Sequence, residues 1–389
     1  MRKGWEYKKL GEVCEVVTGT TPKTNIPEYW GKGHYWVTPA ELNDTTVYID
    51  KTERQITDEA LSKTKLRLLP VGTVLLSSRA PIGKVAIANA EMYCNQGFKN
   101  CICSEAIYNK YLFYFLRLKK DYLNSLGRGA TFKEISKSIV ESIKIPLPPK
   151  STQLAIVSEL DKINELIRLK KEQLKDFDNL AQSLFYEMFG DPVENEKGWE
   201  VKKLNDICDV RDGTHDSPKY LQNSEYILIT SKNIVNGSID FENVNYISEE
   251  DYIKINKRSK VDNGDIIMPM IGTIGNPIIA HIDGTHKFCI KNVALIKFLA
   301  DSTVNNMFIV NLMRCSSFSS YLLNQNKGGT QKFVALGAIR KLPIPLPPLP
   351  LQRLFAQRIE QIEREKSEVQ KSIQDLETLL ASRMQYWFE

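Results

Sequence analysis

IPLPP occupies residues 145–149, and the same five letters return at residues 344–348. Each copy is followed at once by a long run with helical periodicity. A helix cannot extend back through consecutive prolines, because proline lacks a backbone N–H and keeps the preceding residue out of the helical region. IPLPP therefore marks, twice in the chain, the point where a helix begins.

The match between the two halves extends far beyond these prolines. KGWEYKKLGEVCEV at 3–16 aligns with KGWEVKKLNDICDV at 197–210, and GTVLLSSRAPIG at 72–83 aligns with GDIIMPMIGTIG at 264–275. The offset between the copies drifts only from 192 to 199 residues along the chain. Such a drift is typical of a repeat with loop insertions. The chain is a tandem duplication of a unit of roughly 195 residues.

Each copy starts with a globular segment of mixed α and β character. Short β-like runs at 73–76 and 265–268 lie between Gly, Asn and Pro residues, and residues 107–118 have a helical pattern. Residues 1–150 carry 23 Lys and Arg against 15 Asp and Glu, and residues 197–348 carry 18 against 15. The helical segments that follow are acidic or neutral, so the positive charge lies in the two globular segments.

After each IPLPP, apolar residues recur at alternating steps of three and four, which is the heptad pattern of a coiled coil. Ser151 is the expected N-cap of the first helix and Pro350 a first-turn residue of the second, and the first helix should end near Gly190. About 38 residues span roughly 57 Å as a helix. We expect the two helices to pair as an antiparallel coiled coil. The alternative is that each packs on its own globule. The expected seam residues are Leu160, Ile163, Ile167, Leu174, Phe177, Leu184, Ile359, Ile362, Val369, Ile373, Leu376 and Leu380, with Lys170 and Lys366 interrupting the seam.

The predicted fold class is therefore α+β. It consists of a globular segment at 1–148, a helical region at 149–192, a second globular segment at 193–347 and a second helical region at 348–389. Of the 389 residues, 42% are hydrophobic and 25% charged, as in ordinary folded proteins. There is no signal-like N-terminus and no apolar run of roughly 18 residues. We expect a cytoplasmic protein without membrane contact, and the seven scattered cysteines to be reduced.

No catalytic, cofactor-binding or metal-binding residues are predicted. The sequence has no G-x-x-x-x-G-K-[ST] loop for nucleotide phosphates and no Asn/Asp-Pro-Pro-aromatic tetrapeptide of an amino-methyltransferase. Two groups of His and Cys lack the four-ligand spacing of a zinc site, and we expect buried thiols and ordinary histidines there; they are Cys94, Cys101 and Cys103, and His281, His286 and Cys289. The tryptophans Trp5, Trp30, Trp36 and Trp199 are expected to be packing residues rather than stacking platforms for bases.

Two basic globules joined by rigid helices suit a two-part DNA site with an unread middle. At ~3.4 Å per base pair, a spacer of roughly 57 Å corresponds to about 17 base pairs at most. Base-reading residues should lie in loops where the copies diverge, with Arg79 placed to contact guanine and Lys84 phosphate. The candidates are Thr20, Thr21, Lys23, Arg79, Lys84, Gln96, Lys99, Arg128 and Lys133 in the first copy, and Arg211, His215, Lys219, Lys232, Asn233, Thr273, Asn276, Lys291, Asn292, Lys327, Gln331 and Lys332 in the second.

The repeated KGWE–KKL opening and the repeated IPLPP, Gln and Ile close resemble the specificity subunit of a type I restriction-modification system over essentially the whole chain. The resemblance implies two target recognition domains, each reading half of a bipartite double-stranded DNA site. It also implies two conserved helical regions that bind two modification subunits, which carry S-adenosylmethionine and methylate adenine. A restriction subunit would add ATP-driven, Mg-dependent translocation and cleavage, and the chain itself would be non-catalytic. The alternative is a standalone two-domain DNA-binding regulator without an enzyme partner.

Overall fold

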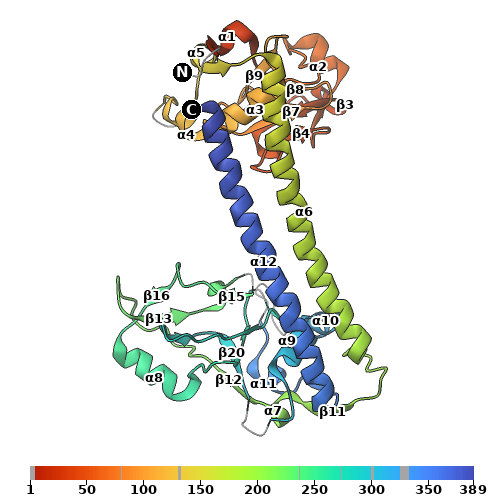
Figure 1. The fold of residues 1–389 in the computed structure, drawn as a ribbon, viewed down its shortest axis with the longest axis vertical. Helices are drawn as coiled ribbons and strands as arrows, with labels where there is room; N and C mark the ends of the chain where they lie inside the picture. The colour runs from red at the N-terminus through yellow and green to blue at the C-terminus, as the bar shows by residue number, and fades with distance from the viewer. Residues whose placement is uncertain are drawn as a thin grey trace. The chain divides into compact units, whose positions relative to one another are not determined.

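The computed structural model describes residues 5–79, 81–129, 133–235, 237–272, 274–298, 302–324 and 333–389 (Figure 1). The chain forms two compact units. Unit 1 comprises Met1–Lys171 and Lys371–Glu389, and unit 2 comprises Glu172–Gln370. Each unit contains one α+β globule and a part of both long helices, so the predicted fold class is confirmed. The division into four segments stays a prediction.

IPLPP is the edge of a small sheet rather than a linker. In unit 1, β10 (Lys144–Leu147) pairs antiparallel with β1 (Glu6–Lys9), with Pro146 opposite Tyr7. In unit 2, β21 (Pro343–Leu346) pairs in the same register with β11 (Glu200–Lys203). Proline is tolerated because these are two-stranded sheets, where one side of each strand needs no partner. The repeated segments that open and close each copy are therefore hydrogen-bonded to one another.

The main sheet of unit 1 has the order β2-β9-β6-β7-β4, and a smaller sheet has the order β5-β3-β8. The five strands of the main sheet are β2 (Cys14–Thr18), β9 (Lys99–Cys103), β6 (Val74–Leu76), β7 (Val85–Ala88) and β4 (Tyr48–Ile49), and those of the smaller one are β5 (Gln55–Ile56), β3 (Trp30–Val37) and β8 (Tyr93–Cys94). The helices of the globule are α1 (Leu10–Val13), α2 (Asp58–Lys63), α3 (Asn109–Leu118), α4 (Lys120–Ser125) and α5 (Lys137–Ser142). The core of unit 1 lies between α3 and the main sheet, with Tyr111, Phe113 and Phe115 of α3 fully or nearly fully buried. The predicted strand near 73–76 and helix near 107–118 are confirmed.

Unit 2 repeats this topology. Its main sheet has the order β12-β20-β17-β18, and β13 and β19 form a parallel pair as β3 and β8 do in unit 1. The strands are β12 (Asp209–Asp212), β20 (Val293–Lys297), β17 (Ile266–Pro269), β18 (Ile278–Ile279), β13 (Tyr226–Ile229), β19 (Lys287–Ile290), β16 (Asn245–Tyr246), β14 (Ile234–Val235) and β15 (Ser238–Ile239). The helices are α7 (Leu204–Ile207), α8 (Glu249–Ser259), α9 (Asn306–Arg314), α10 (Ser316–Asn324) and α11 (Leu336–Arg340). The duplication inferred from the sequence is thus present in three dimensions.

A buried glutamine fastens each long helix to its globule. Gln153 is fully buried in the first turn of α6 (Lys150–Phe189), where its Nε2 donates to the carbonyls of Pro148 and Ala106, both at 3.0 Å. Its Oε1 accepts from the backbone N–H of Tyr108 at 2.8 Å. Gln352 makes the same three contacts at the start of α12 (Leu349–Phe388). The glutamine that follows IPLPP in both copies therefore fixes the direction in which the helix leaves the globule.

The ends of the helices test three predictions. The Ser151 N-cap is wrong, because α6 already begins at Lys150 and the carbonyl of Pro149 accepts the first helical hydrogen bonds. The first-turn position of Pro350 is confirmed, since α12 begins at Leu349. The end of α6 near Gly190 is also confirmed: the helix stops at Phe189, and Gly190 has a φ of 77° that most residues avoid.

The long helices pair antiparallel within each unit. In unit 1, Glu159 accepts from Arg383 and from Trp387, and further along α6 Lys171 Nζ lies 2.7 Å from Glu377 Oε1. In unit 2, Lys366 Nζ lies 2.8 Å from Asp178 Oδ1, so one of the two lysines that interrupt the seam is neutralised by the opposite helix. The predicted seam residues lie buried or half-buried; the buried ones are Leu160, Ile163, Ile167, Ile359, Ile362, Val369 and Ile373, and the half-buried ones are Leu174, Phe177, Leu184, Leu376 and Leu380.

Both helix ends also pack into the globules. In unit 2, Phe189 at the end of α6 contacts Phe308 and Phe355, with ring centroids 4.9 and 5.2 Å apart. In unit 1, Phe388 at the end of α12 contacts Tyr111 at 5.0 Å. Each globule therefore holds the start of the helix that follows it and the end of the other helix. The alternative, in which each helix packs on its own globule, describes only the start of each helix.

The tryptophans that begin each copy of the repeat are packing residues, as predicted. Trp5 stacks on Trp387, and Trp199 Nε1 donates to the carbonyl of Phe189 at 2.9 Å. Trp36 is buried against Trp30. Among the helices of the described residues, none combines the length and the hydropathy that a membrane span requires.

Candidate nucleic-acid interface

Glycine joins two of the predicted loops in unit 1. A Cβ at Gly19 would lie 1.9 Å from the carbonyl oxygen of Asn95, so only glycine allows the loop after β2 to lie against the loop after β8. The backbone N–H of Thr20 donates to the carbonyl of Cys94 at 2.9 Å. The hydroxyl of Thr21 donates to Oε1 of Gln96. The predicted residues of these two loops thus form one surface.

The other two predicted loops of unit 1 meet at Glu134. Its backbone pairs with Arg128 through two hydrogen bonds of 2.9 and 3.0 Å. Its carboxylate accepts from Lys99 Nζ at 2.9 Å and lies 3.9 Å from Arg79 Nη1. The loop that holds Arg79 also contacts the loop after β8, because the N–H of Ser78 donates to the carbonyl of Gly97 at 2.7 Å. All four predicted loops of unit 1 are therefore contiguous.

The predicted residues of unit 1 differ in how much of them reaches the surface. Lys99 is buried, and its ammonium group is held by Glu134 and by Ser78 Oγ. Lys84 is half-buried and donates to the carbonyl of Pro39 at 3.0 Å, so it ties two loops together. Arg79 and Thr21 are also half-buried. The exposed candidates are Thr20, Lys23, Gln96, Arg128 and Lys133.

Unit 2 builds its loop surface with the same backbone geometry. A Cβ at Gly213 would lie 2.4 Å from the carbonyl oxygen of Ile290, and the N–H of Thr214 donates to that carbonyl at 3.0 Å. His215 lies between two polar groups, with Nε2 2.8 Å from Asp212 Oδ2 and Nδ1 3.0 Å from Asn292 Oδ1. His215 therefore orients the Asn292 side chain, which is one of the predicted base-reading amides.

Several predicted cations and amides of unit 2 are engaged inside the protein. Arg211 donates to Asp209, and this hydrogen bond raises the pKa of Arg211. Lys291 is buried and donates to Ser217 Oγ. Asn233 is buried and closes the turn at Thr230, because its Oδ1 accepts a hydrogen bond of 3.0 Å from the N–H of Thr230. The exposed candidates in this loop group are His215, Lys219 and Lys232, while Asn292 is half-buried.

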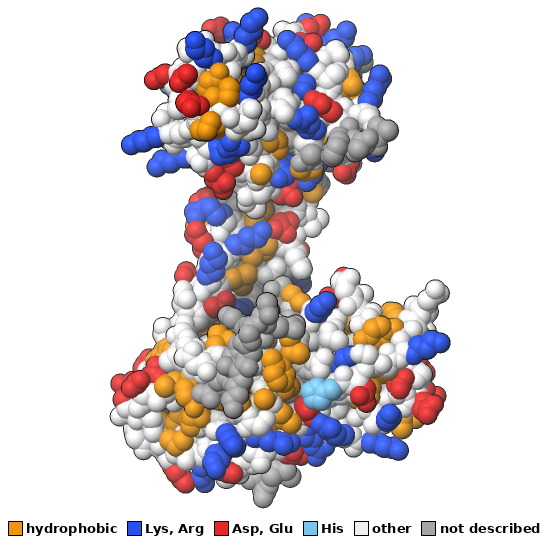
Figure 2. Space-filling model, turned by 180° about the vertical axis from the view of Figure 1, so that it is seen from behind, with side chains coloured by type: hydrophobic (Ala, Val, Ile, Leu, Met, Phe, Trp, Pro, Cys, Tyr) orange, Lys and Arg blue, Asp and Glu red, His pale blue; other side chains and the backbone are white. Residues whose placement is uncertain are grey.

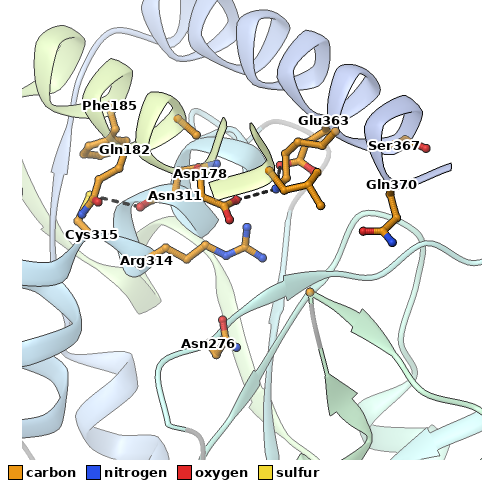
Figure 3. A pocket seen from close by; sticks show the side chains of 14 residues that line it. Asp178, Gln182, Phe185, Asn276, Asn311, Arg314, Cys315, Glu363, Ser367 and Gln370 are labelled. Carbon is orange, nitrogen blue, oxygen red and sulfur yellow. Dashed lines mark hydrogen bonds and ion pairs between the residues drawn. The ribbon is translucent and has the colours of Figure 1, made fainter. Parts of the chain in front are cut away.

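Asn276 lies apart from the other candidates. It lines a cavity of about 770 Å³ in unit 2, together with Arg314 of α9, Asp178 of α6 and Lys366 of α12 (Figure 3). Arg314 reaches across this cavity and donates to the carbonyl of Pro277 at 3.0 Å. Four candidates lie outside the described residues: Thr273, Lys327, Gln331 and Lys332.

The structure also brings forward residues that sequence reasoning missed. Glu134 and Asp212 are acidic, and carboxylates are not the residue types expected to contact phosphates or base acceptors. Each nevertheless organises predicted residues around it, Glu134 by its contacts to Arg79 and Lys99, and Asp212 by its contact to His215 and its ion pair with Arg258. Divergence between the copies could have revealed Glu134, because Phe333 stands at its place in the second copy.

The surface of each globular part carries charges of both signs (Figure 2). Figure 2 shows Lys and Arg side chains over each globular part, interspersed with Asp and Glu. Among the residues that the structure describes, no three His, Cys, Asp or Glu are grouped so that they could hold a metal ion. Loops that carry exposed cations, amides and hydroxyls on a rigid sheet can contact phosphates and the edges of bases. Which of the candidate residues touch DNA stays a prediction.

Comparison with known proteins gives one consistent result. A family model described as the type I restriction modification DNA specificity domain matches residues 2–176 and again residues 196–378. The chain is 33% identical over 380 residues to the type I restriction enzyme MjaIX specificity subunit of Methanocaldococcus jannaschii, covering 91% of this chain and 85% of that one. It is 32% identical over 168 residues to the type I restriction enzyme EcoR124I/EcoR124II specificity subunit of Escherichia coli, covering 41% of each chain.

Two solved structures share the fold. A chain from a type I restriction-modification system, solved in a study of complex assembly and conformational transition, aligns with a TM-score of 0.65 and 18% identity over 99% of this chain and 97% of that one. The type I restriction-modification S subunit from M. genitalium aligns with a TM-score of 0.52 and 13% identity over 99% and 96%. At these identities the two structures support the fold alone.

Proposed function

The chain belongs to the type I restriction modification DNA specificity family, and we propose that its two globules read the two halves of one double-stranded DNA site. It is a non-catalytic DNA sequence-specificity subunit of a type I restriction-modification system. The alternative of a standalone regulator has no support from its relatives, which are named as subunits of restriction enzymes.

The single observation that carries the two-half proposal is the duplicated loop surface. Gly19 and Gly213 produce the same close approach of two loops in the two units, and the side chains displayed there differ between the copies. A shared scaffold with different exposed side chains is what two readers of different base sequences require, since phosphate contacts position a protein and base contacts specify the site.

The helical regions supply the second half of the proposal. Each long helix is continuous over 40 residues, roughly 60 Å at ~1.5 Å per residue, and continuity makes it a stiff spacer. We propose that the paired helices set the length of the unread DNA between the half-sites. The exposed faces of the same helices would bind two modification subunits and, where the system has them, restriction subunits.

The chemistry would lie on these partners. We propose that S-adenosylmethionine binds to the modification subunits and that ATP and Mg²⁺ act on a restriction subunit. The role of this chain is then to choose the DNA and to hold the enzymes on it.

The test is to map methylated bases in DNA exposed to the chain together with its modification subunits. The expected result is one bipartite site with adenine methylation, which disappears when the chain is omitted. Exchange of residues 193–347 for the same segment of a relative should change one half-site and leave the other unchanged. A change in both half-sites, or in neither, would contradict the assignment of one half to each globule.

A further inference from the structure

The two units present one loop position with matching backbone geometry and opposite chemistry. In unit 1 the N–H of Ile135 donates to the carbonyl of Ser78 at 3.0 Å, and in unit 2 the N–H of Val334 donates to that of Met270 at 3.1 Å. The next residue of each loop forms an isolated β-bridge with a residue of another loop. In unit 1 this bridge joins Arg79 and Glu134. The counterpart pair in unit 2 is Ile271 with Phe333. The two pairs therefore occupy equivalent places in the two globules.

In unit 1 this position carries a held guanidinium group. The side chain of Arg79 is 35% exposed, and Nη1 lies 3.9 Å from Glu134 Oε2. Glu134 Oε1 accepts from Lys99 at 2.9 Å, and Lys99 is 7% exposed. At 3.9 Å the contact is an ion pair rather than a hydrogen bond, so the donor fork of Arg79 remains for a partner. Both carboxylate oxygens of Glu134 face cations, so Glu134 has a positioning role.

The planar guanidinium group of Arg79 has two kinds of possible partner on DNA, a phosphate and a base edge. Lys99 at 2.9 Å offsets the negative charge of Glu134, so geometry rather than charge separates the two kinds of partner. The O6 and N7 atoms of guanine are neutral acceptors spaced for a guanidinium fork, and a nearby carboxylate does not oppose them. The chemistry at Arg79 thus favours guanine in the major groove.

In unit 2 the same position is apolar. Phe333 is 38% exposed, and Ile271 beside it is half-buried. In the major groove, an apolar side chain recognises the methyl group of thymine. Neither Phe333 nor Ile271 has a side-chain hydrogen-bond donor, so this pair cannot select guanine through its O6 and N7 atoms.

We propose that Arg79, held by Glu134, reads a guanine in one half-site and that Phe333 contacts a thymine methyl group at the matching place in the other half-site. This inference rests on the proposed function of the two globules. It assigns different bases to equivalent positions, so the two half-sites differ there.

The experiment uses the chain in complex with its modification subunits and a library of DNA duplexes with randomised positions. Bound duplexes are sequenced for the wild type and for Arg79→Lys, which keeps the charge and removes the planar fork. The preference for guanine should fall about 10- to 100-fold at one position of one half-site, with the other half-site unchanged. Glu134→Gln should weaken the same preference to a smaller extent. Phe333→Ala should reduce a thymine preference severalfold at the matching position of the other half-site.

The matched control is Arg67→Lys. Arg67 pairs with Glu15 at 3.0 Å in the same unit but outside the loop cluster, so the selected sequences should not change. A uniform loss of affinity over all sequences in Arg79→Lys would overturn the inference, because it would mark a phosphate contact. Loss at a base other than guanine would overturn it as well. In both cases the wild type would still select a bipartite site, whereas a wild type that selects no sequence would remove the proposed function itself.

Discussion

Substitution of Gln153 by Ala should destabilise unit 1 more than any exposed change on α6. The substitution removes three hydrogen bonds from a fully buried side chain and leaves the N–H of Tyr108 and the carbonyls of Ala106 and Pro148 without their partner. At ~1 kcal/mol for each bond, the loss in the free energy of unfolding is about 3 kcal/mol. For a unit of this size, about 2–4 °C per kcal/mol gives a fall in Tm of roughly 6–12 °C.

Two measurements check this prediction together. Thermal unfolding reports the stability of the unit, and amide hydrogen exchange reports the protection of the Tyr108 N–H, which Gln153 holds. The equivalent N–H in unit 2, that of Asn305, is held by Gln352 and should keep its protection. Leu154→Ala is the matched control, because Leu154 is 46% exposed on the same turn and its loss should cost no more than about 0.5 kcal/mol. A Gln153→Ala protein that melts within 2 °C of the wild type would refute the reasoning.

Three further predictions concern the helix pair and DNA binding. The Arg383 guanidinium lowers the pKa of Glu159, so their pairing stabilises the fold fully above the unfolded pKa of ~4.3 and this stability is lost as pH falls through the lower folded pKa. Glu159→Gln should therefore be less stable than the wild type by about 0.5 kcal/mol at pH 7. Thermal melts of the two proteins should converge as the pH is lowered. The exposed Lys133 is expected to contact the DNA backbone, so Lys133→Ala should weaken binding by a similar factor for all sequences and reduce the salt slope of the binding constant by about 1. Titration at several salt concentrations measures this, and an effect on one base only would contradict a backbone contact. Insertion of one heptad into each of α6 and α12 adds about 10.5 Å and should lengthen the unread spacer by roughly three base pairs in a methylation map, and an unchanged spacer would disprove the measuring role of the helices.

The internal repeat and the patterns within it are enough to predict the architecture. Duplication and the positions of the long helices follow from local patterns: the repeated IPLPP, the heptad spacing and the Gly190 stop are each readable within a short window. Such patterns survive because helix periodicity and proline geometry are properties of neighbouring residues. The two copies of the repeat also differ most in the predicted DNA-reading loops, and the structure shows the four such loops of unit 1 in contact with one another.

The states of individual side chains were decided by the tertiary structure. Lys99 and Lys291 have the residue type of a DNA contact but are buried, and loops distant in sequence bring Glu134 to one and Ser217 to the other. Glu134 was not predicted, since its importance depends on Arg79, which lies 55 residues away in the chain.

The opening stretch shows the same division. The sequence by itself determined that a helix starts after IPLPP, since the prolines act on their own neighbours. Only the tertiary structure decided that IPLPP is a strand paired with the start of its globule, and that Gln153 anchors the helix there. The strand pairing joins residues more than a hundred positions apart, and the buried hydrogen bond of Gln153 joins residues about 45 positions apart. Such contacts depend on the packing of the whole unit rather than on any local pattern.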